Sequence, residues 1–288
     1  KMCYYKMKYE KRGGCMADSR AIGVFDSGLG GLTVARELIR ELPQEDIVYF
    51  GDTARVPYGN RSRETIRKYA AEDESFLLRH SVKLIVAACG TVSSVAADSA
   101  EKLPVPFFEM VTYAAAAAAA ATENNKIGVI GTPVTVNSGS HKKEILKLKP
   151  NAEITACSCP LFVPLVEEGW FSPEDAVVKG TVSRYLEPIK AAGVDTLILG
   201  CTHYPVLEDA VRRFMGESVT LINPGVAVAR AVKKYLEKAD SANEGQNIGT
   251  HRFFVTDKPG SFKKTASVLL GEEIDDRKVE QVDLNSLC

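Results

Sequence analysis

Two cysteines end similar apolar runs, and they are the residues best placed to do chemistry. Cys89 ends "VKLIVAAC" and Cys201 ends "VDTLILGC", 112 positions later. A threonine follows each cysteine within two residues, as Thr91 and Thr202, and His203 comes next in the second stretch. A single cysteine at the end of a buried strand is usually inert. The repeated combination of thiol and hydroxyl favours a shared chemical role.

Two thiols that face each other suit proton transfer at opposite faces of one carbon atom, which is racemisation or epimerisation. One cysteine would act as general base and the other as general acid. The stretch "GTVSS" after Cys89 is suited to begin a helix. The free N–H groups and the dipole of a helix N-terminus bind a carboxylate and lower the pKa of a neighbouring thiol. The sequence therefore predicts an anion held beside a thiolate.

Three further side chains are candidates for adjusting the protonation of the thiols. Asp26 lies in "FDSGLGG", Glu167 in "PLVEEG", and His203 two residues after Cys201. Asp26 could instead form a turn or cap a helix, and Glu167 could lie in solvent at a helix end. His203 is the strongest of the three, because it follows a strand end next to a candidate thiol.

Other kinds of site fit the sequence less well. The stretch "GLGGLT" has two of the three glycines of a dinucleotide-binding loop,. Cys157 and Cys159, with Cys201 and His203, lack the spacing of common zinc sites, so we predict no metal,. A nucleophilic cysteine, as in an amidase, would leave the second thiol unexplained.

Short apolar runs alternate with helical patterns along the chain, which predicts an α/β protein. The runs are apolar on both faces, as in parallel sheets covered by helices on both sides. Ligands of such sheets bind beyond the carboxyl ends of the strands, where both cysteines would project. Strands are predicted at 21–25, 46–50, 83–89, 126–131, 152–157, 195–201 and 219–223, and helices at 33–42, 62–80 and 173–192.

A weak internal repeat predicts two similar, flavodoxin-like lobes with the active site in the cleft between them. "AIGVFDSG" in the first half is similar to "KIGVIGTP" in the second, and the two stretches that end in cysteine are similar to each other,. We expect residues 17–112 and 222–288 to form the first lobe and 113–221 the second. Residues 1–16 are predicted to be a disordered extension. The alanine run 114–121 is predicted to be a thin helix without a functional role,.

Composition excludes several classes of function. The net charge of -1 argues against a general nucleic-acid binder, which usually shows clustered positive charge,. No apolar run reaches the ~20 residues that span a bilayer, and the N-terminus lacks the apolar centre of a signal peptide,. We therefore expect a cytoplasmic protein without a membrane partner. The seven scattered cysteines are predicted to be free thiols,.

From about Ala21 to Leu284 the sequence resembles the glutamate racemases of the cofactor-independent aspartate/glutamate racemase family. The resemblance includes "IGVFDSGLGGLTV", "GDTARVPYG", "VAACGT", "PLFVPLVEEG" and "LILGCTHYP". It implies two α/β lobes around one active site and conversion of L-glutamate to D-glutamate for peptidoglycan. It also implies that no pyridoxal phosphate or other cofactor is needed, and it is compatible with a homodimer.

The resemblance assigns a role to each candidate residue. Cys89 would exchange the proton on the D-glutamate side with help from Asp26, and Cys201 on the L-glutamate side near His203 and Glu167. The residues expected to hold the substrate are Asp26, Ser27, Tyr58, Gly59, Gly90, Thr91, Thr202 and His203.

Two departures from the family pattern accompany this resemblance. Gly90 stands where the family commonly has asparagine, and the stretch after Glu109 lacks the usual Pro-Gly near the crossover between lobes. Two alternatives stay open at this point. A racemase for aspartate is one, since a single methylene is worth only ~1–3 kcal/mol in a pocket. A binding or regulatory homologue without turnover is the other, and Gly90 is the feature that favours it.

Overall fold

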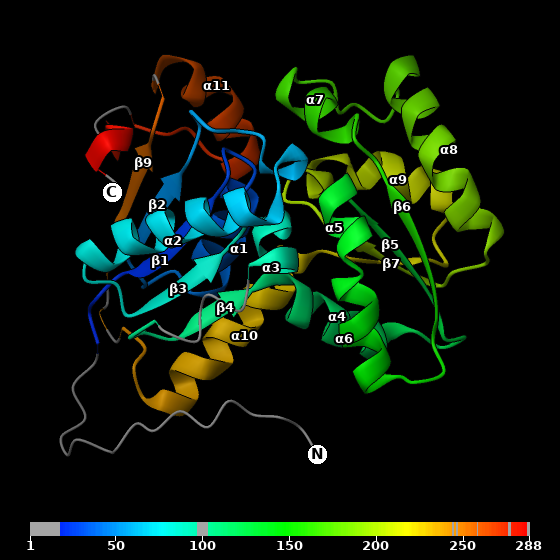
Figure 1. Cartoon of the computed structure of the whole chain (residues 1–288), viewed down its shortest axis with the longest axis horizontal. Helices are drawn as coiled ribbons and strands as arrows, with labels where there is room; N and C mark the ends of the chain where they lie inside the picture. Colours follow the sequence, from blue (N-terminus) through cyan, green and yellow to red (C-terminus); the bar gives the residue numbers. More distant parts are fainter. Residues whose placement is uncertain are drawn as a thin grey trace.

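The computed structural model contains two parallel β-sheets that lie side by side (Figure 1). It describes residues 18–96, 103–243, 245, 247–257, 259–275 and 278–286, so the predicted disordered extension 1–16 lies outside the described residues. The first sheet has the order β10 (Val279–Gln281), β9 (His251–Val255), β2 (Ile47–Gly51), β1 (Ile22–Asp26), β3 (Leu84–Ala87) and β4 (Phe107–Glu109). The second has the order β6 (Glu153–Ser158), β5 (Lys126–Gly131), β7 (Thr196–Leu199) and β8 (Thr220–Ile222). The predicted α/β class with two parallel-sheet lobes is confirmed.

Helices cover both faces of the first sheet. On β1, Ile22 and Val24 belong to the core that includes α1 (Leu32–Glu41) and α10 (Pro224–Ala239). Phe25 points the other way, into a core shared with α2 (Arg63–Arg79). Because successive side chains of a strand point to opposite faces, a sheet covered on both sides needs continuous apolar strands. This is the pattern that the sequence shows.

The alanine run lies in α4 (Met110–Ala121), which covers one face of the second sheet. Ala114, Ala115 and Ala118 are fully buried in a core with Ile127 and Val129 of β5. Their small side chains let the helix lie close to the sheet, so the prediction of a thin helix is confirmed. On the opposite face, side chains of α8 (Ala176–Ala191) and α9 (Glu208–Met215) pack against β5 and β7.

The C-terminal part of the chain returns to the first sheet. Strand β9 pairs with β2, and β10, a strand that the sequence analysis did not predict, pairs with β9. Ile222 of β8 pairs with Ile198, one residue past the boundary predicted at 221. Helix α10 then packs against both α1 and α4, beneath the two sheets in Figure 1. In the described part of the chain, no helix has the length and apolar character to cross a bilayer.

The loops at the carboxyl ends of the two sheets meet each other. Helix α3 (Gly90–Val95) and the short helix η1 (Tyr58–Asn60) of the first lobe both contact α5 (Pro133–Ser138) of the second. Hydrogen bonds also join the lobes. In one of them, Thr33 Oγ1 of α1 donates to the carbonyl oxygen of Thr202 at 2.8 Å and is shared with Gly30 O at 2.9 Å. The segments that carry the candidate residues are thereby held together.

Replacing Thr33 by valine tests the contribution of this hydrogen bond. Thr33 is 2% exposed, and valine fills the same space without a donor. We expect Thr33→Val to lower the free energy of unfolding by about 1–3 kcal/mol, because a buried carbonyl loses a partner. Urea unfolding measures this change, and Thr33→Ser, which keeps the hydroxyl, is the matched control. Equal stability of Thr33→Val and wild type would contradict the expectation.

Candidate active site

Cys89 lies at the end of β3 as the N-cap residue of α3, and its thiol is buried. Its Sγ is 3.5 Å from Ser27 Oγ. Burial raises the pKa of Cys89 to about 12, and the charge of Asp26 adds to this, while hydrogen bonds with Val92 N–H and Ser27 oppose it. The expectation that the helix N-terminus lowers the pKa of this thiol is therefore wrong. Desolvation outweighs the helix, and Cys89 is a neutral thiol at pH 7.

Asp26 ends β1 and is 1% exposed. Its carboxyl forms the turn contact that the sequence left open, because it bonds to the backbone two residues ahead,. Its Oδ2 accepts a hydrogen bond from Gly28 N at 3.0 Å, and its Oδ1 is buried without a hydrogen-bond partner among the described residues. Burial raises the pKa of Asp26, although the charge of His203 and three backbone N–H groups lower it in part. One oxygen of this carboxyl is available to a group that enters the site.

Cys201, His203 and Glu167 form a row beyond the end of β7. Cys201 Sγ is 3.9 Å from His203 Nδ1, and His203 Nε2 is 3.3 Å from Glu167 Oε1. Burial lowers the pKa of His203, but the contacts with Cys201 and Glu167 outweigh it and raise the value to about 10. Glu167 ends α7 (Phe162–Glu167), and its side chain is 44% exposed, so it meets both the site and solvent. The imidazole of His203 therefore carries a positive charge at neutral pH, next to the sulfur of Cys201.

The two halves of the site lie against each other. A Cβ atom on Gly30 would lie 2.3 Å from Thr202 Oγ1 and 2.5 Å from His203 Nδ1, so only glycine fits there. The charge of Cys201 affects the pKa of Cys89, and the charge of His203 affects that of Asp26. The structure thus brings together the five residues that the sequence analysis predicted to be catalytic.

Hydroxyl groups and glycines line the contact between the lobes. Thr91 Oγ1 lies 3.2 Å from Thr132 Oγ1 of the second lobe. A Cβ atom on Gly59 would lie 3.2 Å from Thr132 Cβ, and one on Gly90 would lie 2.5 Å from Gly200 O. Position 90 therefore has no room for a side chain in this arrangement of the lobes, and only its backbone can face a ligand.

The sequence matches the Asp/Glu/Hydantoin racemase family over residues 22–232, well over half of the chain. The chain belongs to the Asp/Glu/Hydantoin racemase family. Glutamate racemase of Geobacter metallireducens is 43% identical over 268 residues, which cover 93% of this chain and 98% of the relative. The structure of glutamate racemase from Francisella tularensis in complex with D-glutamate has a TM-score of 0.86 and 38% identity, and covers 93% of this chain and 99% of that chain. Glutamate racemase isoform RacE1 of Bacillus anthracis has a TM-score of 0.87 and 38% identity, with coverage of 92% and 98%.

Some polar residues near this site were not predicted from the sequence. Thr132 follows β5 directly, as Thr202 follows the end of β7, and this parallel position could have revealed it. Asp52 and Arg55 follow β2 within "GDTARVPYG", where charged residues directly after an apolar strand are a signal. Tyr58, by contrast, was predicted, but its hydroxyl contacts Asp52 and Asp73, so a ligand could meet only its backbone.

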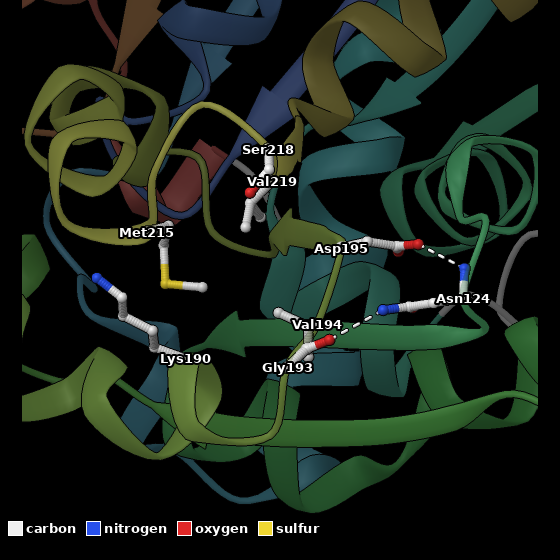
Figure 2. Close-up of a pocket in the computed structure, with 8 residues that line it drawn as sticks. All are labelled: Asn124, Lys190, Gly193, Val194, Asp195, Met215, Ser218 and Val219. Atoms are coloured by element: carbon white, nitrogen blue, oxygen red, sulfur yellow. Dashed lines mark hydrogen bonds between the residues drawn. The ribbon is translucent and has the colours of Figure 1, made fainter.

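A cavity of about 400 Å³ lies at the opposite, amino edge of the second sheet (Figure 2). Its carboxylate, Asp195, already accepts hydrogen bonds from Asn124 N at 2.6 Å and Thr122 Oγ1 at 2.7 Å. Its ammonium group, on Lys190, donates to Phe214 O at 2.6 Å. Both of these charged groups therefore already have hydrogen-bond partners within the protein. Within the described ranges, no group of three or more His, Cys, Asp or Glu side chains is arranged to hold a metal ion.

The unequal surroundings of the two thiols predict unequal rates of alkylation. Thiolate is the reactive form, and Cys89, with a pKa of about 12, is almost entirely thiol at neutral pH,. We expect iodoacetamide to modify Cys201 at least about tenfold faster than Cys89, and His203→Asn to reduce this preference. Peptide mass spectrometry over time measures both rates, with the half-buried free thiol of Cys157 as an internal reference. Faster modification of Cys89 would overturn this description of the site.

Proposed function

We propose that this chain is a glutamate racemase that interconverts L- and D-glutamate with two thiols and no cofactor. The observation that carries the proposal is the close approach of two segments from different sheets, each with a buried thiol: a Cβ atom on Gly90, next to Cys89, would lie 3.7 Å from the Cα atom of Cys201. Cys89 is held as a thiol by burial, whereas Cys201 lies beside a histidine whose pKa is raised to about 10. One acid and one base are what a two-base racemisation needs in each direction. Relatives that are glutamate racemases support the choice of substrate.

In the proposed mechanism, the Cys201 thiolate removes the α-proton of L-glutamate, and the electron pair of the C–H bond stays on the α-carbon. The Cys89 thiol then donates its proton to the opposite face, which gives D-glutamate. Cys201 ends as a thiol and Cys89 as a thiolate, so the same steps run in reverse from D-glutamate. His203, oriented by Glu167, stabilises the thiolate of Cys201. Asp26 assists proton exchange at Cys89.

The remaining predicted residues are proposed to hold the substrate. The hydroxyls of Ser27, Thr91 and Thr202 and the backbone of Tyr58 and Gly59 would bind the two carboxylates and the ammonium group. The N–H groups at the start of α3 favour an anion. Gly90 would contribute its backbone alone.

The cellular role, location and assembly proposed for this chain rest on its resemblance to the glutamate racemases. D-glutamate would supply peptidoglycan synthesis in the cytoplasm, and the chain would form a homodimer. We propose residues 17–112 with 222–288, and residues 113–221, as the two bodies that hold the substrate between them.

Chiral chromatography of purified protein with L-glutamate tests the proposed function directly. With EDTA present and no pyridoxal phosphate, we expect L- and D-glutamate to reach a racemic mixture from either side. A parallel incubation with L-aspartate measures substrate preference, since the one methylene that separates the two acids contributes only ~1–3 kcal/mol of binding free energy in a pocket. Unchanged glutamate, with folded protein and reduced thiols, would refute the assignment and favour a binding homologue. Faster turnover of aspartate would assign the other substrate.

Replacing each thiol separately tests the two-base mechanism. Cys89→Ala and Cys201→Ala should each lower racemisation by at least about 10²–10⁴-fold, the usual contribution of a general acid or base. In D₂O each variant is expected to retain exchange of the α-proton of one enantiomer only, as seen by NMR or mass spectrometry. Cys157→Ala, outside the site, is the control. Full racemase activity of either alanine variant would exclude the mechanism.

A further inference from the structure

A second buried polar cluster lies next to the active site, and the mechanism does not use it. It consists of Asp52 at the end of β2, Arg55, Tyr58 of η1, Asp73 of α2 and Thr256 after β9; we call it the Asp73 cluster. Asp52, Tyr58 and Asp73 are all fully buried. Buried polar groups are almost always hydrogen-bonded, so each close contact between two oxygen atoms of the cluster needs one proton.

The hydroxyl of Tyr58 contacts two carboxyl groups. It forms a short hydrogen bond with Asp52 Oδ2, and its oxygen lies 3.1 Å from Asp73 Oδ2. A tyrosine hydroxyl has one proton to donate, and an ionised carboxylate has none. If both carboxyls were ionised, one of these two oxygen–oxygen contacts would contain no proton. One of the two acids must therefore carry a proton.

Asp52 is the ionised member of the pair. Its Oδ2 accepts from Arg55 Nε at 2.5 Å as well as from Tyr58. Its Oδ1 accepts from Thr256 Oγ1 at 2.9 Å, since Ala54 N–H donates to that same hydroxyl at 2.9 Å and leaves its proton free for Asp52. Both oxygens of Asp52 are acceptors, as in a carboxylate.

Asp73 is the acid of this pair that can carry the proton. Its contact with the guanidinium of Arg55 is long, 3.4 Å from Nη2 to Oδ1, and the carbonyl oxygen of a neutral carboxylic acid can also accept it,. The same guanidinium also pairs with Glu72, so one Arg55 faces three carboxyls. Burial raises the pKa of Asp73 well above its usual value, and the charge of Asp52 raises it further.

We propose that Asp73 is a protonated, neutral carboxylic acid that donates a hydrogen bond to Tyr58 Oη and thereby positions the substrate-holding segment Tyr58–Gly59. Asp73 is a positioning residue, because it reaches the site only through Tyr58. The effect of Asp73 on substrate binding rests on the proposed function. The protonation of Asp73 does not, so an experiment can refute one and leave the other standing.

The position of Tyr58 matters because η1 lies at the junction of the lobes. Gly59, the next residue, packs against Thr132 of the second lobe, which in turn contacts Thr91 at the start of α3. The hydroxyl end of Tyr58 is thus anchored in the Asp73 cluster while its backbone borders the site. A shift of the anchor would move the backbone that faces the ligand.

Infrared spectroscopy of the whole protein at neutral pH detects the proton directly. The difference spectrum between wild type and Asp73→Asn is expected to contain the C=O stretching band of a protonated carboxylic acid, which shifts in D₂O. Comparison with Asp73→Asn isolates this group from Asp26, whose pKa is also raised. Asp52→Asn is the matched control, and its difference spectrum is expected to show loss of a carboxylate band. Loss of a carboxylate band in Asp73→Asn would overturn the proposal.

The pH dependence of stability supplies a second readout. A carboxyl whose pKa is raised by folding stabilises the native state fully below its unfolded pKa of ~3.9, and this contribution is lost as the pH rises towards the folded pKa. The charged or titratable groups that face Asp73 are Asp52, Arg55, Tyr58 and Glu72. Between pH 5 and pH 7, where the proposal keeps Asp73 protonated in the native state only, the unfolding equilibrium constant of wild type should rise by roughly tenfold per pH unit relative to Asp73→Asn. Parallel pH profiles would contradict a neutral Asp73.

Steady-state kinetics tests the positioning role. Asn keeps a donor for Tyr58 Oη, whereas Asp73→Leu removes it in a similar volume. We expect Asp73→Leu to raise the KM for glutamate by about tenfold, with a smaller change in kcat, because one hydrogen bond that aids binding is lost. Asp73→Asn should restore KM to within about threefold of wild type. Equal KM values for Asp73→Leu and wild type would remove the positioning role, and absence of racemisation by wild type would refute only the proposed function.

Discussion

Removal of water from ionisable side chains is the constraint on which this site depends. Cys89 and Asp26 lie at strand ends inside the contact between two lobes, and burial raises the pKa of both. His203 is equally buried, yet its pKa rises because Cys201 and Glu167 supply negative charge. Desolvation therefore decides the pKa of Cys89, whereas at His203 the contacts with Cys201 and Glu167 outweigh it,. Cys89 keeps its proton, and His203 carries a positive charge beside Cys201.

This asymmetry requires close contact between the lobes, which glycines and hydroxyl groups provide. Gly30 leaves room for Thr202 and His203, and Thr33 holds the carbonyl of Thr202. A bulkier residue at position 30 would separate the two halves and admit water, and the pKa shifts would shrink with it. The pKa values of the ionisable groups at this contact between the lobes therefore depend on how closely the lobes pack.

The sequence was sufficient to predict the fold class, most strands and the five proposed catalytic residues, because apolar periodicity and strand-end positions are local signals. Contacts between segments that lie far apart in the chain were not predictable in this way. Thr33 and Thr202 are 169 residues apart, and Asp52 and Thr256 are 204 apart. The pKa of Cys89 was predicted in the wrong direction, since a helix N-terminus is visible in sequence whereas the depth of burial is not. Asp73 occupies an inward position of α2 with Ile66, Ala70 and Leu77, and its carboxyl there was a signal left unused.

Gly90 links the departure from the family pattern to the geometry of the cleft. Where the resemblance leads one to expect asparagine, the backbone of α3 lies so close to Gly200 that a Cβ atom would be 2.5 Å from its carbonyl oxygen. Gly200 is itself enclosed, since a Cβ atom there would be 2.6 Å from Ile130 O. Gly200 is also held in place by the hydrogen bond from its N–H to Ile130 O at 2.7 Å, so a side chain at position 90 would push the two segments apart. Glycine at position 90 thus leaves the site without a polar side chain there and permits the close approach of the two cysteine-bearing segments.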